Sequence, residues 1–517
     1  MHKEIVLAID VGTQSVRALA FDPRGQIIDS VRIVYQVPYN SPRPGWAEQA
    51  PGFYWRNLAE SCRKLWARGI VEPESLAAVA VTYQRSTIIN LDHNGDPLRP
   101  AMVWLDQRRA RKLPSVGPLW SAIFGITGLS GTLRHVQAES EANWIRENQP
   151  TIWAKTAHFL LLSGYITYRL TGQFVDSTGC QVGFLPFDYK SQTWPPLSHW
   201  KWRAIPINPE ILPTLVPPGD RLGEVTAEAS VFTGLPEGLP VIAAASDKAC
   251  EVLGAGCLEP HQGCIGYGTT ATINVNSQRY IEPVPLIPAY PSACPDAYNL
   301  EVQIYRGFWM VSWFKDEFAW PETTLARQSG VEAEELLNRL AEKVRPGSGG
   351  LVLQPFWSPG VRYPGPEARG AIIGFNGSHT RGHMYRALLE GMAYAVREGR
   401  EKIEKRTKVP VAELLVCGGG SRSDVVMQIT ADVFNLPAVR PSVYEASGLG
   451  AAILAMVGAG LQPDLPTAVK EMTGTGQVFK PHPGSVKIYD ELYRKVYRRM
   501  YRKISPLYKS IMDIKIP

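Results

Sequence analysis

The sequence has few cysteines and no long apolar run, which argues against a disulfide-bonded framework and against a transmembrane helix. Its 517 residues include seven cysteines, spread from Cys62 to Cys417. An odd number with this spread fits reduced thiols in a core better than a disulfide framework. No run of about 18 apolar residues predicts a transmembrane helix. The N-terminus enters a strand pattern without the regions of a secretory signal. We therefore expect a cytoplasmic protein that does not enter the membrane.

The chain also lacks a strong charge of either sign. Its formal net charge is +6 at pH 7, with one local excess of basic residues near the C-terminus. This mild balance implies no acidic polymer, and hence no nucleic acid, as a partner. Hydrophobic residues at 45% and charged residues at 20% are typical of a globular protein. Because 517 residues exceed what one core usually serves, we expect two large domains.

Three common motifs for nucleotides and metals are missing. The sequence contains no G-x-x-x-x-G-K-[ST], no G-x-G-x-x-G after a strand and no H-E-x-x-H. These patterns would indicate a P-loop, a dinucleotide fold or a zinc protease. Cys250, Cys257 and Cys264 are seven residues apart, which fits no common zinc spacing. Any nucleotide must therefore be held by other elements.

A strand that ends in an aspartate is the first positive feature. Residues 5–9 are apolar and lead into Asp10, after which Gly12 opens a turn before alternating residues 16–20. Glycine lets backbone N–H groups approach an anion closely. A carboxylate beside such groups suits a phosphate that carries Mg²⁺. An ordinary hairpin with a polar tip is the alternative.

The same pattern returns in the second half of the chain. Residues 264–276, "CIGYGTTATINVN", give an apolar strand, then Gly268, Thr269 and Thr270, and then an alternating strand. The two units are about 256 residues apart. The repetition predicts a duplicated domain whose two Gly-Thr hairpins grip phosphates from either side.

A glycine turn and one further carboxylate complete the pattern. The segment "ELLVCGGGSRSDVVMQITADVF" predicts a strand, a turn at Gly418–Gly420 and a helix. Such a turn has no side chains to keep a flat ligand away, and the helix start favours an anion, although a simple tight connection explains the glycines too.

Asp247 follows another apolar strand. It could accept the proton of an alcohol that attacks a γ-phosphate, or simply cap a helix.

Other segments predict structure rather than chemistry. An apolar face over 381–406 predicts a long helix. The prolines of 195–240 predict a loop-rich region. Tyrosines recur every four residues from Tyr489 to Tyr501, which predicts a helix with an aromatic seam. Its basic residues are better explained as a solvated face than as a nucleic-acid or membrane contact.

Taken together, these segments are similar to the motifs of the FGGY family of carbohydrate kinases, which includes glycerol kinase, xylulokinase and ribulokinase. The likeness covers roughly residues 4–475, with Phe375 departing from the family's usual smaller residue. It implies an α/β fold with two ribonuclease H-like domains, as in actin and hexokinase, flanking a central cleft. The implied divisions are an N-terminal kinase domain at 1–255, a C-terminal kinase domain at 256–480 and a helical tail at 481–517. The matching segments are "DVGTQSVRALAFD", "GWAEQAPGFYW", "SDKACEVLGAG", "GYGTT", "GAIIGFNGSHTRGHMYRALLEGMAYA" and "CGGGSRSDVVMQITADVFNLPAV".

The resemblance implies transfer of the γ-phosphate of ATP to a hydroxyl of a sugar or polyol. By position, Asp247 is the implied general base and Asp10 organises Mg²⁺. Closure of the two domains would exclude water, so that ATP is not hydrolysed. The implied nucleotide-binding residues are Gly12, Thr13, Gln14, Ser15, Gly268, Thr269, Thr270, Gly418, Gly419, Gly420 and Ser421.

The acceptor is harder to name. Gln84-Arg85 followed by Thr87 resembles glycerol kinase, but Ser86 stands where glycerol kinases carry a glutamate. Xylulokinases carry Gln-Met-His-Gly there, which also fails to match. We expect a ketose or sugar alcohol, with a pentulose or pentitol favoured and glycerol as the alternative. The predicted substrate-binding residues are Gln84, Arg85, Ser86, Trp104, Asp106 and Asp247, with Arg108 in the same segment.

Two other classes remain as alternatives. The implied fold also serves actin-like and hsp70-like ATPases, and a degenerate member could bind nucleotide without catalysis. Neither role needs an alcohol base, so Asp247 favours the kinase. The sequence leaves a homodimer open.

Overall fold

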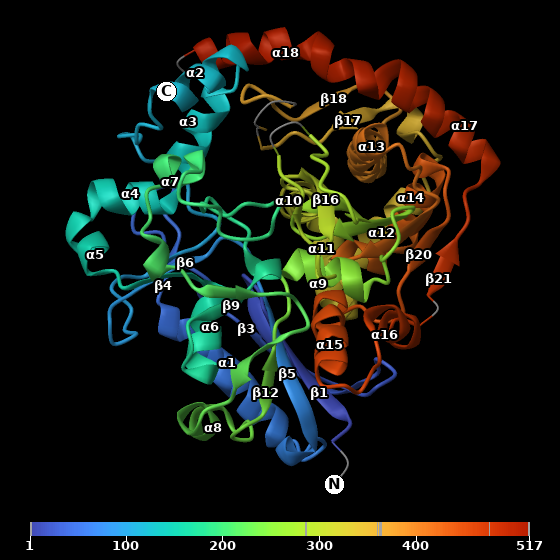
Figure 1. The fold of residues 1–517 in the computed structure, drawn as a ribbon. Coiled ribbons are helices and arrows are strands. Elements are labelled where there is room, and N and C mark those ends of the chain that lie inside the picture. Colours follow the sequence, from blue (N-terminus) through green and yellow to red (C-terminus); the bar gives the residue numbers. More distant parts are fainter. Residues whose placement is uncertain (1–2, 285–286, 359, 361–363, 475, 515–517) are drawn as a thin grey trace.

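The computed structural model of the protein describes residues 3–284, 287–358, 360, 364–474 and 476–514. The chain forms two lobes, each built around one large mixed β-sheet with helices against it (Figure 1). The two-domain α/β fold predicted from the sequence is confirmed.

The first sheet has the strand order β11-β12-β5-β1-β2-β3. Strand β1 pairs antiparallel with β2 and parallel with β5, so the opening hairpin lies beside a parallel strand. On β1, Val6 and Ala8 pack on one face of the sheet while Leu7 and Ile9 pack on the other. Because both faces are covered, this strand is apolar throughout. The bounds are β1 Ile5–Val11, β2 Ser15–Phe21, β3 Ile27–Val34, β5 Leu76–Tyr83, β11 Arg221–Glu224 and β12 Pro240–Ile242.

The second sheet repeats this arrangement. Its order is β15-β16-β14-β13-β19-β20-β21, and β13 again pairs antiparallel with the next strand and parallel with a later one. The outer pair β20 and β21 is antiparallel, as β12 and β11 are. This matched topology confirms the predicted duplication. The bounds are β13 Gln262–Tyr267, β14 Ala271–Ser277, β15 Tyr290–Pro291, β16 Tyr298–Ile304, β19 Glu413–Cys417, β20 Ala438–Arg440 and β21 Gln477–Phe479.

Helices cover both faces of the first sheet. One face packs against α1 (Pro51–Trp66), α6 (Leu162–Thr171) and α8 (Ala227–Thr233). The other face packs against α9 (Asp247–Gly254), α15 (Ala446–Gly458) and α16 (Leu465–Met472). Helices α15 and α16 therefore belong to the core of the first lobe although they come from the C-terminal half of the chain. The ranges 1–255 and 256–480 remain predictions, with α9 and β13 on either side of the division.

A smaller insertion extends the first lobe. It contains a four-stranded sheet, a two-stranded sheet and several short helices around a core of its own. The prediction of a loop-rich segment at 195–240 was incomplete, because α7, β10, β11 and α8 lie there. Each is too short to show a period in the sequence. The bounds are β4 Glu48–Gln49, β6 Ile88–Leu91, β7 Ala101–Met102, β8 His158–Leu161, β9 Val175–Ser177, β10 Thr214–Val216, α2 Pro118–Ile126, α3 Ser130–Glu139, α4 Glu141–Asn148, α5 Pro150–Lys155 and α7 Trp200–Ala204.

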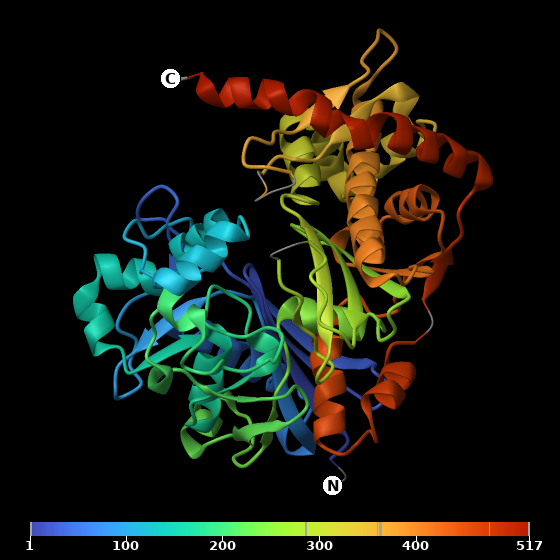
Figure 2. The same ribbon diagram turned by 45° about the horizontal axis from the view of Figure 1, so that its top comes forward.

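The second lobe is organised around the predicted long helix. This helix, α13, spans Arg381–Thr407 and packs on the second sheet in one continuous core. The aromatic seam predicted for the C-terminal helix is also confirmed, because Tyr489, Tyr493, Tyr497 and Tyr501 are all buried. Figure 2 shows this helix lying across the second lobe and extending beyond it. The bounds are α10 Trp309–Phe318, α11 Trp320–Ser329, α12 Ala333–Glu342, β17 Val352–Gln354, β18 Ala371–Ile373, α14 Asp424–Phe434, α17 Pro483–Leu492, a π-helical turn Tyr493–Tyr497 and α18 Arg498–Asp513.

All seven cysteines are described, and each is a free thiol. Within the ranges given above, no helix combines the length and the apolar character needed to cross a membrane.

Candidate active site

Two equivalent hairpins supply the candidate phosphate contacts. In the first, the Gly12 N–H donates to the Ser15 carbonyl at 3.1 Å, and in the second, the Gly268 N–H donates to the Thr270 carbonyl at 3.1 Å. A Cβ at Gly12 or Gly268 would meet nothing closer than 3.4 Å. The protein's own packing therefore does not demand glycine at either position. Close approach of a ligand to the backbone would explain both glycines.

Side chains of the two hairpins differ in availability. Gln14 and Thr269 are exposed at the tips, and Thr270 is half-buried. Ser15 is buried, and its hydroxyl accepts a hydrogen bond from Arg32 Nε at 3.4 Å. Of the predicted contacts in these loops, Gln14 and Thr269 are the most accessible to a phosphate.

The Gly418–Gly420 turn lies directly against the second hairpin. Gly418 has a φ of +82°, and a Cβ there would lie 2.7 Å from the carbonyl oxygen of Tyr267. A Cβ at Gly420 would lie 2.5 Å from the ring of Phe308, whereas one at Gly419 would meet nothing within 4 Å. The outer side of this turn is therefore open. Ser421 Oγ donates to the Gly418 carbonyl at 2.8 Å and closes the turn.

Asp10 lies near the end of β1 and is almost fully buried. Arg17 Nη1 donates to its Oδ2 at 2.7 Å, and Arg17 Nε lies 3.3 Å from Glu445. Burial raises the pKa of Asp10 to about 6, against the attraction of Arg17 and with a further upward effect of Asp247. A second positive charge near Asp10 would be electrostatically favourable.

The donor set around Asp10 fits one kind of metal. Across the described ranges, no three His, Cys, Asp or Glu side chains gather as a metal-binding group. A cation at Asp10 would therefore keep water or phosphate oxygens as most of its ligands. Mg²⁺ binds in this way, usually with one or two carboxylates.

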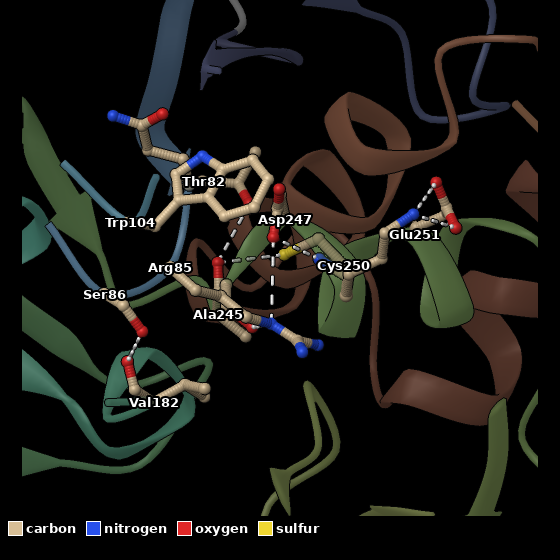
Figure 3. Close-up of polar contacts among 12 residues, drawn as sticks. Thr82, Arg85, Ser86, Trp104, Val182, Ala245, Asp247, Cys250 and Glu251 are labelled. Carbon is tan, nitrogen blue, oxygen red and sulfur yellow. Dashed lines mark hydrogen bonds and ion pairs between the residues drawn. The ribbon is translucent and has the colours of Figure 1, made fainter. Parts of the chain in front are cut away.

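Asp247 is the first residue of α9, and Ser246 is the N-cap. The Lys248 N–H donates to its Oδ1 at 2.8 Å, while a third of the side chain stays exposed. Burial raises the pKa of Asp247, and the positive charges of Arg85 and Lys248 oppose that effect. A carboxylate with a raised pKa is a stronger base than a free aspartate, which suits proton abstraction. Figure 3 shows the Asp247 carboxylate facing Arg85, whose Nε is 3.9 Å from Asp247 Oδ1.

The sheet explains why these residues meet. Strands β1, β5 and β12 are mutually parallel, and Asp10 is the register partner of Thr82 on β5. Thr82 Oγ1 donates to the Ala245 carbonyl at 2.9 Å, which ties the end of β5 to the segment before α9 (Figure 3). Ligands of such sheets bind at the carboxyl ends of parallel strands. Asp10 lies near the end of β1, Gln84 directly follows β5, and Asp247 comes after β12, so all three belong to this edge of the sheet.

Two predicted substrate residues, Gln84 and Trp104, are joined through Thr13 of the first hairpin. The Thr13 hydroxyl accepts from Trp104 Nε1 at 2.9 Å and donates to Gln84 Oε1 at 2.7 Å. Gln84 Nε2 donates to the Tyr54 hydroxyl at 3.1 Å. Trp104 itself is exposed over 37% of its surface. The first hairpin is thus joined to an exposed aromatic ring, and a ring of this kind could take a stacked sugar.

Ser86 is held by the main chain. Its backbone has a φ of +52°, and its hydroxyl donates to the Val182 carbonyl at 3.0 Å (Figure 3). The Ser86 N–H donates to the same carbonyl at 3.2 Å. Gly183 leaves room beside this hydroxyl, since a Cβ there would lie 3.5 Å from it. The position therefore presents neither a carboxylate nor a bulky side chain.

Both carboxylate oxygens of Asp106 are hydrogen-bonded to other residues of the protein. Its two carboxylate oxygens accept from the Ala47 N–H at 2.8 Å and from Arg108 Nε and Nη2 at 2.8 and 2.6 Å. The Arg108 guanidinium lies 4.0 Å from the ring centre of Trp46 and 4.5 Å from that of Trp144. In this structure Asp106 holds the loop that carries Trp104, and its hydrogen-bonding capacity is used there.

Sequence reasoning missed a contribution from the second lobe. Arg85 Nη1 donates to Glu301 Oε1 at 3.0 Å, and its guanidinium lies 5.1 Å from the ring centre of Tyr290. Arg85 Nε is also 3.9 Å from Asp247 Oδ1. A single glutamate inside the strand pattern "YNLEVQI" was the available signal for Glu301, because a buried charge needs a partner.

Comparisons with known proteins agree with this geometry. Residues 5–254 match the N-terminal domain of the FGGY family of carbohydrate kinases, and residues 263–459 match its C-terminal domain. The chain is 30% identical over 500 residues to the uncharacterized sugar kinase YgcE of Escherichia coli, covering 95% of this chain and 92% of that protein. It is 31% identical over 488 residues to a glycerol kinase of Thermococcus gammatolerans, covering 92% of each.

A solved structure is similar over nearly the whole chain. The crystal structure of xylulose kinase from Rhodospirillum rubrum has a TM-score of 0.81 to this protein and is 28% identical. The match covers 98% of this chain and all of that one. With both domain matches spanning most of the 517 residues, the chain belongs to the FGGY family of carbohydrate kinases.

Proposed function

We propose that this carbohydrate kinase transfers the γ-phosphate of ATP to a hydroxyl of a pentulose or pentitol, with Asp247 as the general base. The observation that carries the proposal is the position of Asp247, which starts α9 beside Arg85 and keeps a third of its side chain exposed. The carboxylate takes the proton of the attacking hydroxyl as the hydroxyl oxygen bonds to the γ-phosphorus, while the bond from that phosphorus to the bridging oxygen breaks and ADP leaves. Trp104 offers the sugar a ring to stack on.

The nucleotide is assigned to the hairpins and the glycine turn. Backbone N–H groups around Gly12 and Gly268 face the phosphates, with Gln14 and Thr269 as accessible side chains. The open side of Gly419 supports the nucleoside. Asp10 would hold Mg²⁺ through its carboxylate and through water, and the metal would neutralise charge that develops on the transferred phosphoryl group.

The acceptor class is proposed from Ser86. Its hydroxyl is already bonded to Val182, and Gly183 beside it is small. A small triol would find no carboxylate at this position to accept hydrogen bonds from its hydroxyl groups, whereas a longer acceptor can use the space. The similarity to a xylulose kinase structure supports a five-carbon acceptor. Glycerol remains the second candidate, because Gln84-Arg85 matches glycerol kinases and one such enzyme is 31% identical.

We also propose that the protein is cytoplasmic, as the sequence led us to expect, and we keep a homodimer as a hypothesis. An ATPase of the actin or hsp70 type is the less favoured class, because such a protein needs no alcohol base and so has no need for a carboxylate in the position of Asp247. Acceptor-dependent release of ADP separates a kinase from an ATPase.

A kinetic panel tests the proposal. ADP release is measured with Mg²⁺ and ATP alone and then with separate pentuloses, pentitols, gluconate and glycerol. We expect kcat/KM for the best five-carbon acceptor to exceed that for glycerol by at least about tenfold, or roughly 1.4 kcal/mol. If glycerol is the best acceptor, the glycerol kinase assignment replaces this one. ADP release that no acceptor stimulates would contradict kinase activity towards this panel.

A further inference from the structure

An ion pair joins the two lobes beside the proposed base. Arg85 follows β5 of the first lobe, and Glu301 lies on β16 of the second. Arg85 Nη1 lies 3.0 Å from Glu301 Oε1, and the Arg85 and Glu301 side chains are only 15% and 3% exposed. The Tyr290 ring packs against the guanidinium. Because the pair is shielded from water, its attraction is stronger than that of a surface pair.

The same guanidinium faces a second carboxylate. Arg85 Nε is 3.9 Å from Asp247 Oδ1, which is beyond hydrogen-bond distance, and 3.4 Å from Ser246 Oγ. In Figure 3 the Nε of Arg85 is the nitrogen nearest to Asp247, and the other two guanidinium nitrogens point away from it. Two carboxylates therefore compete for Arg85, and Glu301 holds the shorter contact.

The pair is also incompletely bonded. Among the described residues, Arg85 Nη2 and Glu301 Oε2 are buried and have no hydrogen-bond partner. Leaving both atoms unpaired costs free energy that a bridge serving only stability would avoid. The arrangement is therefore better explained by a role in the site than by stability alone.

We infer that Glu301 is a positioning residue, which holds the guanidinium of Arg85 off Asp247 and so keeps the Asp247 carboxylate available to the acceptor hydroxyl. This inference rests on the proposed function. A direct hydrogen bond from Arg85 would stabilise the Asp247 carboxylate and make it a weaker base. Since Glu301 belongs to the second lobe, the arrangement around the base depends on the contact between the lobes.

The pH dependence of the rate reports this competition. The charged groups around Asp247 are Arg85, Lys248, Glu251 and Asp10. Loss of Glu301 frees Arg85 to approach Asp247. A closer positive charge lowers the pKa of Asp247. Activity is lost at low pH when the base is protonated, so the acid limb should move to lower pH while the plateau rate falls.

The experiment compares Glu301→Ala with Glu301→Gln and a control, Glu322→Gln. Glu322 forms a two-point pair with Arg381 at 2.7 and 3.1 Å within the second lobe, so its variant loses a similar ion pair elsewhere. For Glu301→Ala we expect kcat with the best acceptor to fall at least about tenfold. The acid limb should shift by roughly half a pH unit or more, with little change in KM for ATP. Glu301→Gln, which keeps an acceptor oxygen, should lie between Ala and the natural residue.

A double variant tests whether Glu301 acts through Arg85 or stabilises the protein independently of it. If Glu301 acts through Arg85, the variant R85A/E301A should be no slower than R85A alone. An unshifted acid limb in both Glu301 variants, or additive losses in the double variant, would overturn the inference. Thermal unfolding and nucleotide binding are measured alongside, and Glu301→Gln serves if Glu301→Ala does not fold. Transfer to no acceptor by the unaltered protein would overturn the proposed function as well, whereas normal transfer with an unshifted Glu301 profile overturns this inference alone.

Discussion

Replacing Asp247 with asparagine removes the proposed base with little change of shape. The amide oxygen can still accept the Lys248 N–H, which now donates to Oδ1 at 2.8 Å, so the start of α9 is kept. The phosphate hairpins and the glycine turn do not involve this side chain. We therefore expect phosphoryl transfer to fall while ATP still binds.

The size of the loss follows from the chemistry. Removal of a general base costs about 10² to 10⁴ in rate, or roughly 2.7 to 5.4 kcal/mol of transition-state stabilisation.

The stability of the folded protein, in contrast, should stay the same or increase in Asp247→Asn. Burial raises the pKa of Asp247, so the folded state disfavours its charged form, and this cost is present at neutral pH and disappears as the pH falls below the pKa of the unfolded aspartate. The neutral amide avoids that cost, so Asp247→Asn should unfold at an equal or higher temperature at pH 7.

The assay is acceptor-dependent ADP release at saturating ATP, with nucleotide affinity measured by calorimetry. Asp464→Asn is the matched control. Asp464 caps α16 through the Thr467 N–H at 2.8 Å, and asparagine is an equally good cap. Near-normal turnover in Asp247→Asn would refute the role of this residue. A loss of ATP affinity as large as the loss of rate would refute the separation of base and nucleotide sites.

The metal site, the glycine turn and the closure of the lobes can each be tested separately. The pKa of Asp10 is about 6, so in the free protein its carboxylate binds protons below that pH. Raising the Mg²⁺ concentration should therefore extend activity to lower pH. The variant Asp10→Asn should need at least about tenfold more Mg²⁺ for half-maximal rate. An unchanged Mg²⁺ requirement in this variant would place the metal elsewhere. Gly418→Ala should destabilise the protein by about 1 kcal/mol or more in urea unfolding, because of its positive φ and the nearby Tyr267 carbonyl, whereas Gly419→Ala should not. Equal effects of the two substitutions would contradict the packing described here. The radius of gyration should shrink when an ATP analogue and the best acceptor are added together, and an unchanged scattering profile would contradict closure of the lobes.

Elements whose residue pattern is local could be predicted before the structure was known. The apolar run before Asp10, the turn at Gly12 and the alternating strand after it predicted the first hairpin, and the same spacing around Gly268 predicted its repeat. These features are readable because strand period and turn residues act over a few positions. The apolar face of α13 was equally local. The family motifs then predicted which loops meet a nucleotide.

Which polar side chains are already hydrogen-bonded within the protein could be seen only in the folded chain. Sequence reasoning placed Asp106 and Ser86 in the substrate segment, but the structure bonds Asp106 to Arg108 and Ser86 to Val182. Hydrogen-bond partners of a side chain depend on loop conformation, and Val182 is 96 residues from Ser86. No spacing rule covers such a separation.

Contacts between the lobes were likewise decided by the fold. Arg85 and Glu301 are 216 residues apart in sequence, and they meet because β16 of the second sheet faces the loop after β5 of the first. Helix α15 packs on the first sheet although its sequence shows only an apolar helix. A hydrophobic pattern tells which face of an element is buried, but it does not tell which element covers that face. Burial and long-range pairing, which set the pKa of Asp247 and the position of Arg85, therefore exist only once the two sheets have packed.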